Sequence, residues 1–192
     1  MRKITVYNFL ALNGFFKAPD EDTSWHKHGE EEARYSEEAL AQDENILLFG
    51  RKTYEMMASF WPTPQAEELF PKVAAGMNKA EKIVFSESPF EPEWQNTQVV
   101  SGDIVEKIRE IKKSPGKNMT ILGSGTIINL FTDHGLIDEY QFMIDPVALP
   151  DGTPVFKNIK QKLDLRLTSS KVFKSGVVLL NYQPINKQEE GR

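Results

Sequence analysis

Two glycine-containing segments carry the residue types that proteins use to bind phosphate. Gly50-Arg51-Lys52-Thr53 follows an apolar run, and Gly123-Ser124-Gly125-Thr126 follows another. Glycine lets a ligand approach the backbone, and the free N–H groups of a first helical turn attract anions. An arginine can grip a phosphate with two parallel hydrogen bonds. Either segment alone is typical of a surface turn, so it is the pair that indicates a phosphate-binding cleft.

Neither segment matches a nucleotide motif in full. The third glycine of a dinucleotide fingerprint would stand at Ile128, and no Gly-Lys-Ser/Thr follows to make a P-loop. The sequence also shows no Ser-His-Asp arrangement and contains no cysteine. An enzyme without an evident nucleophile can leave the difficult chemistry to a bound cofactor.

Residues 15–29 hold the remaining candidates for metal chemistry. Four side chains fall at positions one, three, five and twelve of a calcium loop: Asp20, Asp22, Ser24 and Glu31. Position six, where the sharp turn needs glycine, is Trp25. His26 and His28 lack a third ligand of clear spacing, so we expect solvated histidines and no metal site.

Composition excludes several classes of protein. Hydrophobic residues make up 40% and charged residues 27% of the 192, as in ordinary soluble domains. The net charge of −5 and the lack of a basic stripe argue against a nucleic-acid partner. The apolar run at the start is short and lacks a cleavage-site pattern, and no run reaches the roughly 18 residues of a membrane span. Together with the lack of cysteine, this favours a cytoplasmic protein without a membrane partner.

The elements that position the two segments alternate between strand and helix. Strands are expected at 4–12, 46–49, 83–85, 99–100, 119–122 and 139–147, and helices at 30–42 and 52–60, after Asp103 and after the second glycine segment, with Gly135 ending the last. Residues 163–185 read as a hairpin about Lys174-Ser175-Gly176. This order predicts one α/β domain over residues 1–185, with a mixed, mostly parallel sheet of about eight strands. Residues 186–192 are expected to be a disordered tail.

The segment between the first strand and the first helix is long. Its length, its scattered charge and Pro19 and Gly29 predict few buried contacts, with Trp25 as the largest apolar anchor. We therefore expect residues 15–29 to be mobile without ligand and to close over a substrate.

Four segments in order resemble the dihydrofolate reductase-fold family: YNFLALNGFF, LLFGRKTYE, KIVFSES and ILGSGTIINLFTDHGLIDEYQFMIDPVALPDGTPVF. The last is especially similar to the reductase domain of the bifunctional riboflavin-biosynthesis deaminase-reductase and to its stand-alone relatives. The resemblance covers residues 3–156 well and the hairpin loosely. It implies a dihydrofolate reductase-like fold, NADPH as cofactor, and hydride transfer to a pterin-like or ribosyl-pyrimidine substrate.

The resemblance also implies roles for single residues. Arg51 would face the 2′-phosphate of the adenosine ribose, Lys52 and Thr53 would lie along the pyrophosphate after Gly50, and Ser86 would sit beside the adenosine. The second helix N-terminus would wrap the pyrophosphate through Gly123, Ser124, Gly125, Thr126 and Ile127. The nicotinamide would be bordered by Ala11 and Leu12, followed by Asn13 and Gly14.

The sequence departs from this family on the substrate side. The acid that grips a pteridine has Glu30 as its nearest match, with Glu31 and Glu32 competing, and Phe142 stands where a threonine usually backs that acid. Glu87 follows Ser86 and would repel a nearby phosphate.

We therefore expect an NADPH-dependent reductase acting on a small heterocyclic or carbonyl substrate, with Glu30 or water as proton source. A non-catalytic nucleotide-binding module and a diverged dihydrofolate reductase are the alternatives. Members of the resembling family often pair, so the resemblance implies a homodimer through an apolar edge near Phe142 or in the tail.

Overall fold

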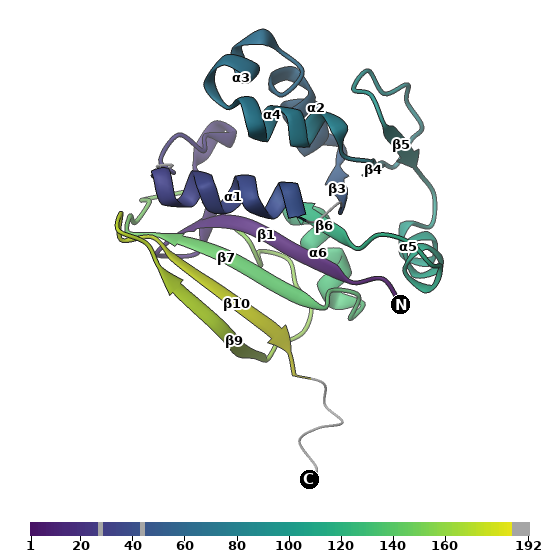
Figure 1. The fold of residues 1–192 in the computed structure, drawn as a ribbon. Coiled ribbons are helices and arrows are strands. Elements are labelled where there is room, and N and C mark those ends of the chain that lie inside the picture. The colour runs from purple at the N-terminus through teal and green to yellow at the C-terminus, as the bar shows by residue number, and fades with distance from the viewer. Residues whose placement is uncertain (27–28, 43–44, 186–192) are drawn as a thin grey trace.

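The computed structural model describes residues 1–26, 29–42 and 45–185 and shows a single large sheet with helices on both faces (Figure 1). Eight strands lie in the order β5-β4-β3-β6-β1-β7-β10-β9. The five pairings from β5 to β7 are parallel, and β10 runs antiparallel to β7 and β9. The expected mixed, mostly parallel sheet with a terminal hairpin is confirmed.

The expected elements are present in the expected order, and the described residues add two short strands, two helices and a 3-10 turn. The strands are β1 (Ile4–Ala11), β2 (Phe15–Lys17), β3 (Ile46–Gly50), β4 (Lys82–Phe85), β5 (Thr97–Val100), β6 (Met119–Leu122), β7 (Glu139–Asp145), β8 (Thr153–Pro154), β9 (Leu165–Val172) and β10 (Val178–Pro184). The helices are α1 (Glu30–Gln42), α2 (Arg51–Phe60), α3 (Pro64–Leu69), α4 (Pro71–Lys79), α5 (Ile104–Lys113) and α6 (Gly125–Asp133), with a 3-10 turn at Pro19–Glu21. None of the helices within the described ranges is long and apolar enough to cross a membrane. The expected tail, residues 186–192, lies outside those ranges.

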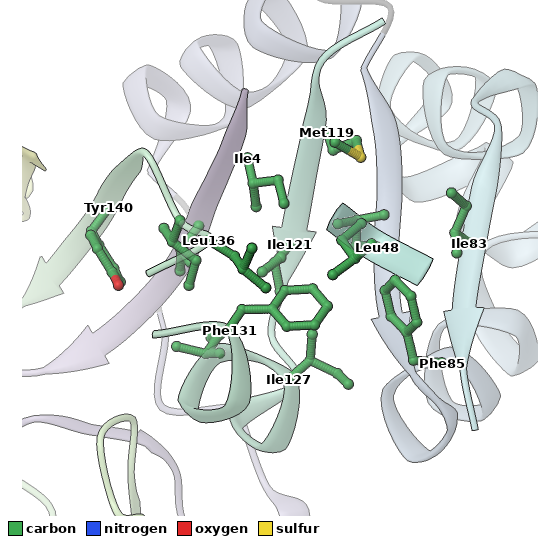
Figure 2. Close-up of a cluster of buried hydrophobic side chains, with 14 of the residues drawn as sticks. Ile4, Leu48, Ile83, Phe85, Met119, Ile121, Ile127, Phe131, Leu136 and Tyr140 are labelled. Carbon is green, nitrogen blue, oxygen red and sulfur yellow. The ribbon is translucent and has the colours of Figure 1, made fainter. Parts of the chain in front are cut away.

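The main core fills the space between one face of the sheet and helices α5 and α6. Figure 2 shows Phe131 and Ile127 of α6 beside Ile121 of β6 and Leu48 of β3, and these four side chains are almost completely buried. Period-two alternation in β1 sends Ile4, Val6 and Leu10 into this core. The intervening residues of each strand face the other layer, which holds α1 to α4.

Helices α3 and α4 were not expected from the sequence. Pro62 and Pro64 were interpreted only as the end of the preceding helix. A proline is also favourable in the first turn of a helix, so the same residues are compatible with the start of the next one. Thr63 caps α3 by accepting a hydrogen bond from the Ala66 backbone N–H, and Pro71 opens α4. The two helices lie beside α2 and extend the layer that covers β3 and β4.

The apolar edge proposed for a homodimer is only partly as expected. Phe142 is buried, with 4% of its surface exposed, because it packs between Tyr140 and Phe156. Leu167 and Val172 on the edge strand β9 are exposed. The homodimer itself stays a prediction.

Candidate functional site

The two glycine segments meet at the carboxyl edge of the sheet. Gly50 ends β3, and its backbone N–H donates a hydrogen bond to Ser124 Oγ over 2.8 Å. A Cβ atom placed on Gly123 would lie 3.3 Å from Thr53 Cγ2, so the second turn passes directly over the start of α2. Segments more than seventy residues apart in the chain therefore form one surface, which we call the glycine arm.

The glycine arm carries two helix N-termini. Helices α2 and α6 both start there, and neither has an acidic residue in its first turn or a side-chain cap on its N-terminal N–H groups. Ser124 takes a left-handed backbone conformation (φ 61°), which turns the chain sharply from β6 into α6. Two positive dipole ends and their uncapped N–H groups make this surface suited to an anion such as a pyrophosphate.

The glycine arm is one end of a cleft of about 1320 Å³. A site for one drug-sized ligand has about 300–1,000 Å³, so this cleft has room for a cofactor and a second small molecule side by side. Of the cofactor residues implied by resemblance, those that line it are Gly50, Arg51, Lys52, Thr53, Ser86, Gly123, Ser124, Gly125, Thr126 and Ile127.

The structure does not bring Ala11 and Leu12 to the cleft lining. Ala11 is buried beneath the sheet edge, whereas 70% of Leu12 is exposed to solvent. Phe9 and Asn8, slightly earlier on the same strand, line the cleft in their place. The first strand was expected to run to residue 12, but it ends at Ala11. The Gly14 backbone N–H donates a hydrogen bond to the Ala11 carbonyl and forms a turn there.

Arg51 lies on the rim of the glycine arm. Its guanidinium carbon stands 4.7 Å from the centre of the Phe90 ring, and its Nε donates to Glu55 Oε1 over 2.8 Å. These contacts hold the planar group in place and leave the two terminal Nη groups as a fork. Ser86 is buried nearby in the wall, and the exposed Glu87 also lines the cleft.

The other end of the cleft, which we call the inner chamber, lies on the sheet face beneath α1 and α2. Thr5, Thr120 and Leu47 stand side by side in register on β1, β6 and β3. Tyr7 and Gln141, also paired in register, continue this floor, and the Tyr7 hydroxyl lies 3.0 Å from Ser36 Oγ on α1. All of these residues line the cleft.

Aromatic side chains form the far wall of the inner chamber. Phe60, Trp61 and Phe70 meet edge to face, with ring centres 5.1 to 6.4 Å apart. They come from the end of α2 and the junction of α3 and α4. Neither this wall nor the polar floor was expected from the sequence.

The three acidic residues considered as proton donors lie away from the cleft lining. Glu30 is exposed at the start of α1. Glu31 accepts a hydrogen bond from the Lys174 backbone N–H, and the buried Glu32 accepts one from the Ser175 hydroxyl. The hairpin turn after β9 therefore holds two of them, and the catalytic role of Glu30 stays a prediction that the cleft geometry does not support.

The expectation of few buried contacts in residues 15–29 holds for residues 19–24, which are exposed, and is wrong for His26. His26, expected to be solvated, is buried: its Nδ1 lies 2.7 Å from Asp145 Oδ2, and its ring stacks on Phe9. A Cβ on Gly125 would lie 2.9 Å from the Phe16 ring, so β2 packs against the glycine arm. The segment forms part of the cleft wall, and its closure over a substrate stays a prediction. His28 lies outside the described residues.

Comparison with known proteins gives relatives along most of the chain. The chain is 30% identical over 138 residues to the uncharacterized protein YyaP of Bacillus subtilis, covering 72% of this chain and 73% of YyaP. It is 25% identical over 178 residues to the uncharacterized protein YwjB of the same organism, covering 93% and 96%.

Solved structures share the fold at low sequence identity. A putative riboflavin biosynthesis protein from Shewanella superposes with a TM-score of 0.70 at 20% identity, covering 96% of this chain and 99% of that one. Dihydrofolate reductase from Enterococcus faecalis, complexed with NADP(H) and RAB-propyl, gives 0.62 at 14% identity over 96% and 97%. The expected dihydrofolate reductase-like fold is thus confirmed.

The family is shown by sequence. Residues 2–179, nearly all of the chain, match the model of the RibD C-terminal domain. The match spans both glycine segments, the strands that carry the inner chamber and most of the terminal hairpin. The chain therefore belongs to the RibD C-terminal domain family.

Proposed function

We propose that this protein is an NADPH-dependent reductase that passes a hydride to a small heterocyclic or carbonyl substrate. The observation that carries the proposal is the joining of two uncapped helix N-termini into one glycine arm, at the end of a cleft large enough for two ligands. Membership of the RibD C-terminal domain family and the fold shared with an NADP(H)-bound dihydrofolate reductase support it.

Each part of the cleft has a role in this proposal. The first-turn N–H groups of α2 and α6 bind the pyrophosphate, and the Arg51 fork binds the ribose 2′-phosphate. NADPH supplies the hydride when it is bound. The inner chamber orients the substrate, and its aromatic wall excludes water from the reacting atoms.

The alternative of a diverged dihydrofolate reductase has less support. Among the described residues, α1 contributes Ala33 and Ser36 to the cleft and none of its carboxylates. Phe142 lies on the opposite face of the sheet from the chamber floor, packed against Phe156. Within the described part of the chain, no carboxylate of α1 and no hydroxyl at position 142 therefore faces the chamber to hold a pteridine.

The test has two stages. Calorimetric titration with NADPH and with NADH should show one site per chain that prefers NADPH. Oxidation of NADPH, followed by its absorbance with a panel of pteridines, pyrimidines, quinones and aldehydes, should then identify a substrate. Binding without oxidation by any panel member would favour a non-catalytic nucleotide-binding module, and the absence of NADPH binding would refute the proposal.

A further inference from the structure

The charged side chains of the cleft are distributed unevenly. Those that line it are Lys17, Glu21, Arg51, Lys52, Glu55, Glu87 and Lys157, together with the titratable His26. They lie on α2 at and just after the glycine arm, in the segment after β4, in the segment after β1 and in the segment after β8. The residues named above for the floor, the α1 side and the aromatic wall of the inner chamber carry hydroxyls, amides, aliphatic groups and aromatic rings.

The polar groups of the chamber are neutral. Burial raises the pKa of the Tyr7 hydroxyl well above its ordinary value, so it stays protonated beside Ser36 Oγ. The Asn45 side-chain amide donates to Thr120 Oγ1 over 3.0 Å, which leaves the Thr120 hydroxyl proton to donate elsewhere. Hydroxyls and amides can both donate and accept, as ring carbonyl and ring N–H groups require.

Charged or titratable groups beside the chamber are engaged, among them His26, which stacks on Phe9 and whose Nδ1 lies 2.7 Å from Asp145 Oδ2. Glu139 accepts a hydrogen bond from Gln141 Nε2 over 3.0 Å, and Glu32 is bound to the Ser175 hydroxyl. Lys72 of α4 pairs with Glu37 of α1 at the surface, 3.0 Å apart. A phosphate or carboxylate entering the chamber would lose its hydration and meet no cation among the floor and wall residues named above, and a buried charge without a partner is costly.

We propose that the inner chamber binds an uncharged, flat heterocycle, whose reacting ring carries neither a phosphate nor a carboxylate. This deepens the proposed reductase function and rests on it. The wall of Phe60, Trp61 and Phe70 offers ring faces and edges to such a molecule, and the floor of Thr5, Thr120 and Gln141 offers hydrogen bonds to its carbonyl and N–H groups. Unlike a phosphorylated sugar derivative, such a substrate would require no cationic side chain in the chamber.

A pair of matched probes tests the charge preference. Lumazine, an uncharged pteridine-dione at mildly acidic pH, and lumazine-6-carboxylate are titrated into the full chain at saturating NADP⁺, with calorimetry as readout. Lumazine should bind about tenfold tighter or more, because the carboxylate would be desolvated without a partner. Equal or tighter binding of the carboxylate would overturn the proposal, and so would binding of neither probe.

Two variants locate the effect. Thr120→Val keeps the shape and removes the hydroxyl, so lumazine binding should weaken about fivefold while NADPH binding is unchanged. Ser36→Lys puts a cation on the α1 wall and should shift the preference toward the carboxylate. If lumazine binding responds to neither change, the ring does not sit in this chamber. A titration of the wild-type protein with NADPH alone distinguishes this proposal from the proposed reductase function, since absence of NADPH binding would refute the reductase function itself.

Discussion

The glycine arm and the inner chamber are built from different parts of the polypeptide. The glycine arm is largely backbone: its shape depends on Gly50, Gly123 and Gly125, each within 3.3 Å of a neighbour if given a Cβ atom. The inner chamber is made of side chains from β1, β3, β6, β7, α1, α2 and the α3–α4 junction. A surface made of backbone can form in any chain that has the same turns, whereas the chemistry of a surface made of side chains depends on the identity of each residue. In the proposed function, the first would therefore bind the cofactor and the second would set the substrate preference.

The largest expected effect concerns the inner chamber. Methotrexate should bind orders of magnitude more weakly than to a working dihydrofolate reductase, and dihydrofolate should not be reduced at an ordinary enzymatic rate. Sites built around a specific buried hydrogen bond discriminate strongly, and the described chamber lacks the carboxylate that a diaminopteridine requires. Fluorescence titration and a dihydrofolate assay check this, and tight methotrexate binding with steady turnover would refute it.

The glycine arm is tested by adding a side chain to it. Gly123→Val should weaken NADPH binding about a hundredfold, because the new side chain would press on Thr53 where the cofactor must approach. Gly135→Val is the matched control: Gly135 has the same φ of about 61° but nothing within 4 Å. Both variants should lose stability by ~1–2 kcal/mol, and only the first should lose cofactor binding. Equal losses of NADPH binding would show that strain, not contact, is responsible.

Within the glycine arm, Arg51 should distinguish the two nicotinamide cofactors. Arg51→Ala should weaken NADPH binding by about 1.5–3 kcal/mol, or about tenfold to a hundredfold, and leave NADH binding nearly unchanged. The reason is the Nη fork, which can make two charge-assisted hydrogen bonds to a 2′-phosphate. Lys52→Ala is the control, because it removes a neighbouring positive charge that cannot make the paired hydrogen bonds of a guanidinium. Calorimetry with both cofactors decides it, and equal changes for NADPH and NADH would count against this role.

The smallest effect is expected in the cleft wall, at the pair of His26 and Asp145. Asp145→Asn removes the charge that faces the buried His26, and should cost about 1 kcal/mol, a few degrees in Tm. Residues 15–29 should then be cut faster by proteases. Asp20→Asn, at an exposed position of the same segment, is the control and should change neither Tm nor cleavage. Unchanged cleavage in Asp145→Asn would show that the pair does not hold the segment in place.

The two regions also differ in how well the amino-acid sequence alone predicts them. The glycine arm was predicted because Gly50-Arg51 and Gly123-Ser124 are contiguous and each sits at a strand end. The helix at 30–42 and the hairpin were predicted because periodicity is local. Thr5, Thr120 and Gln141 come from three strands and meet only through their register, which no single segment encodes.

His26 illustrates the same limit. Its partner Asp145 is 119 residues away, at the end of β7. A histidine in a polar loop therefore has the sequence context of a solvated residue, although the fold buries it. Helices α3 and α4 were missed for a local reason, because the prolines that open them were interpreted only as terminators.

The central claim is that one cleft binds a cofactor and a neutral ring in two separable regions. The most direct measurement is a calorimetric comparison of the wild-type protein, Gly123→Val and Thr120→Val, each titrated with NADPH and, separately, with lumazine. We predict that the wild-type protein binds both ligands. Gly123→Val should lose NADPH binding and keep lumazine binding, whereas Thr120→Val should keep NADPH binding and bind lumazine more weakly. If either variant weakened both ligands equally, or if the wild-type protein bound neither, the two-region account would be contradicted.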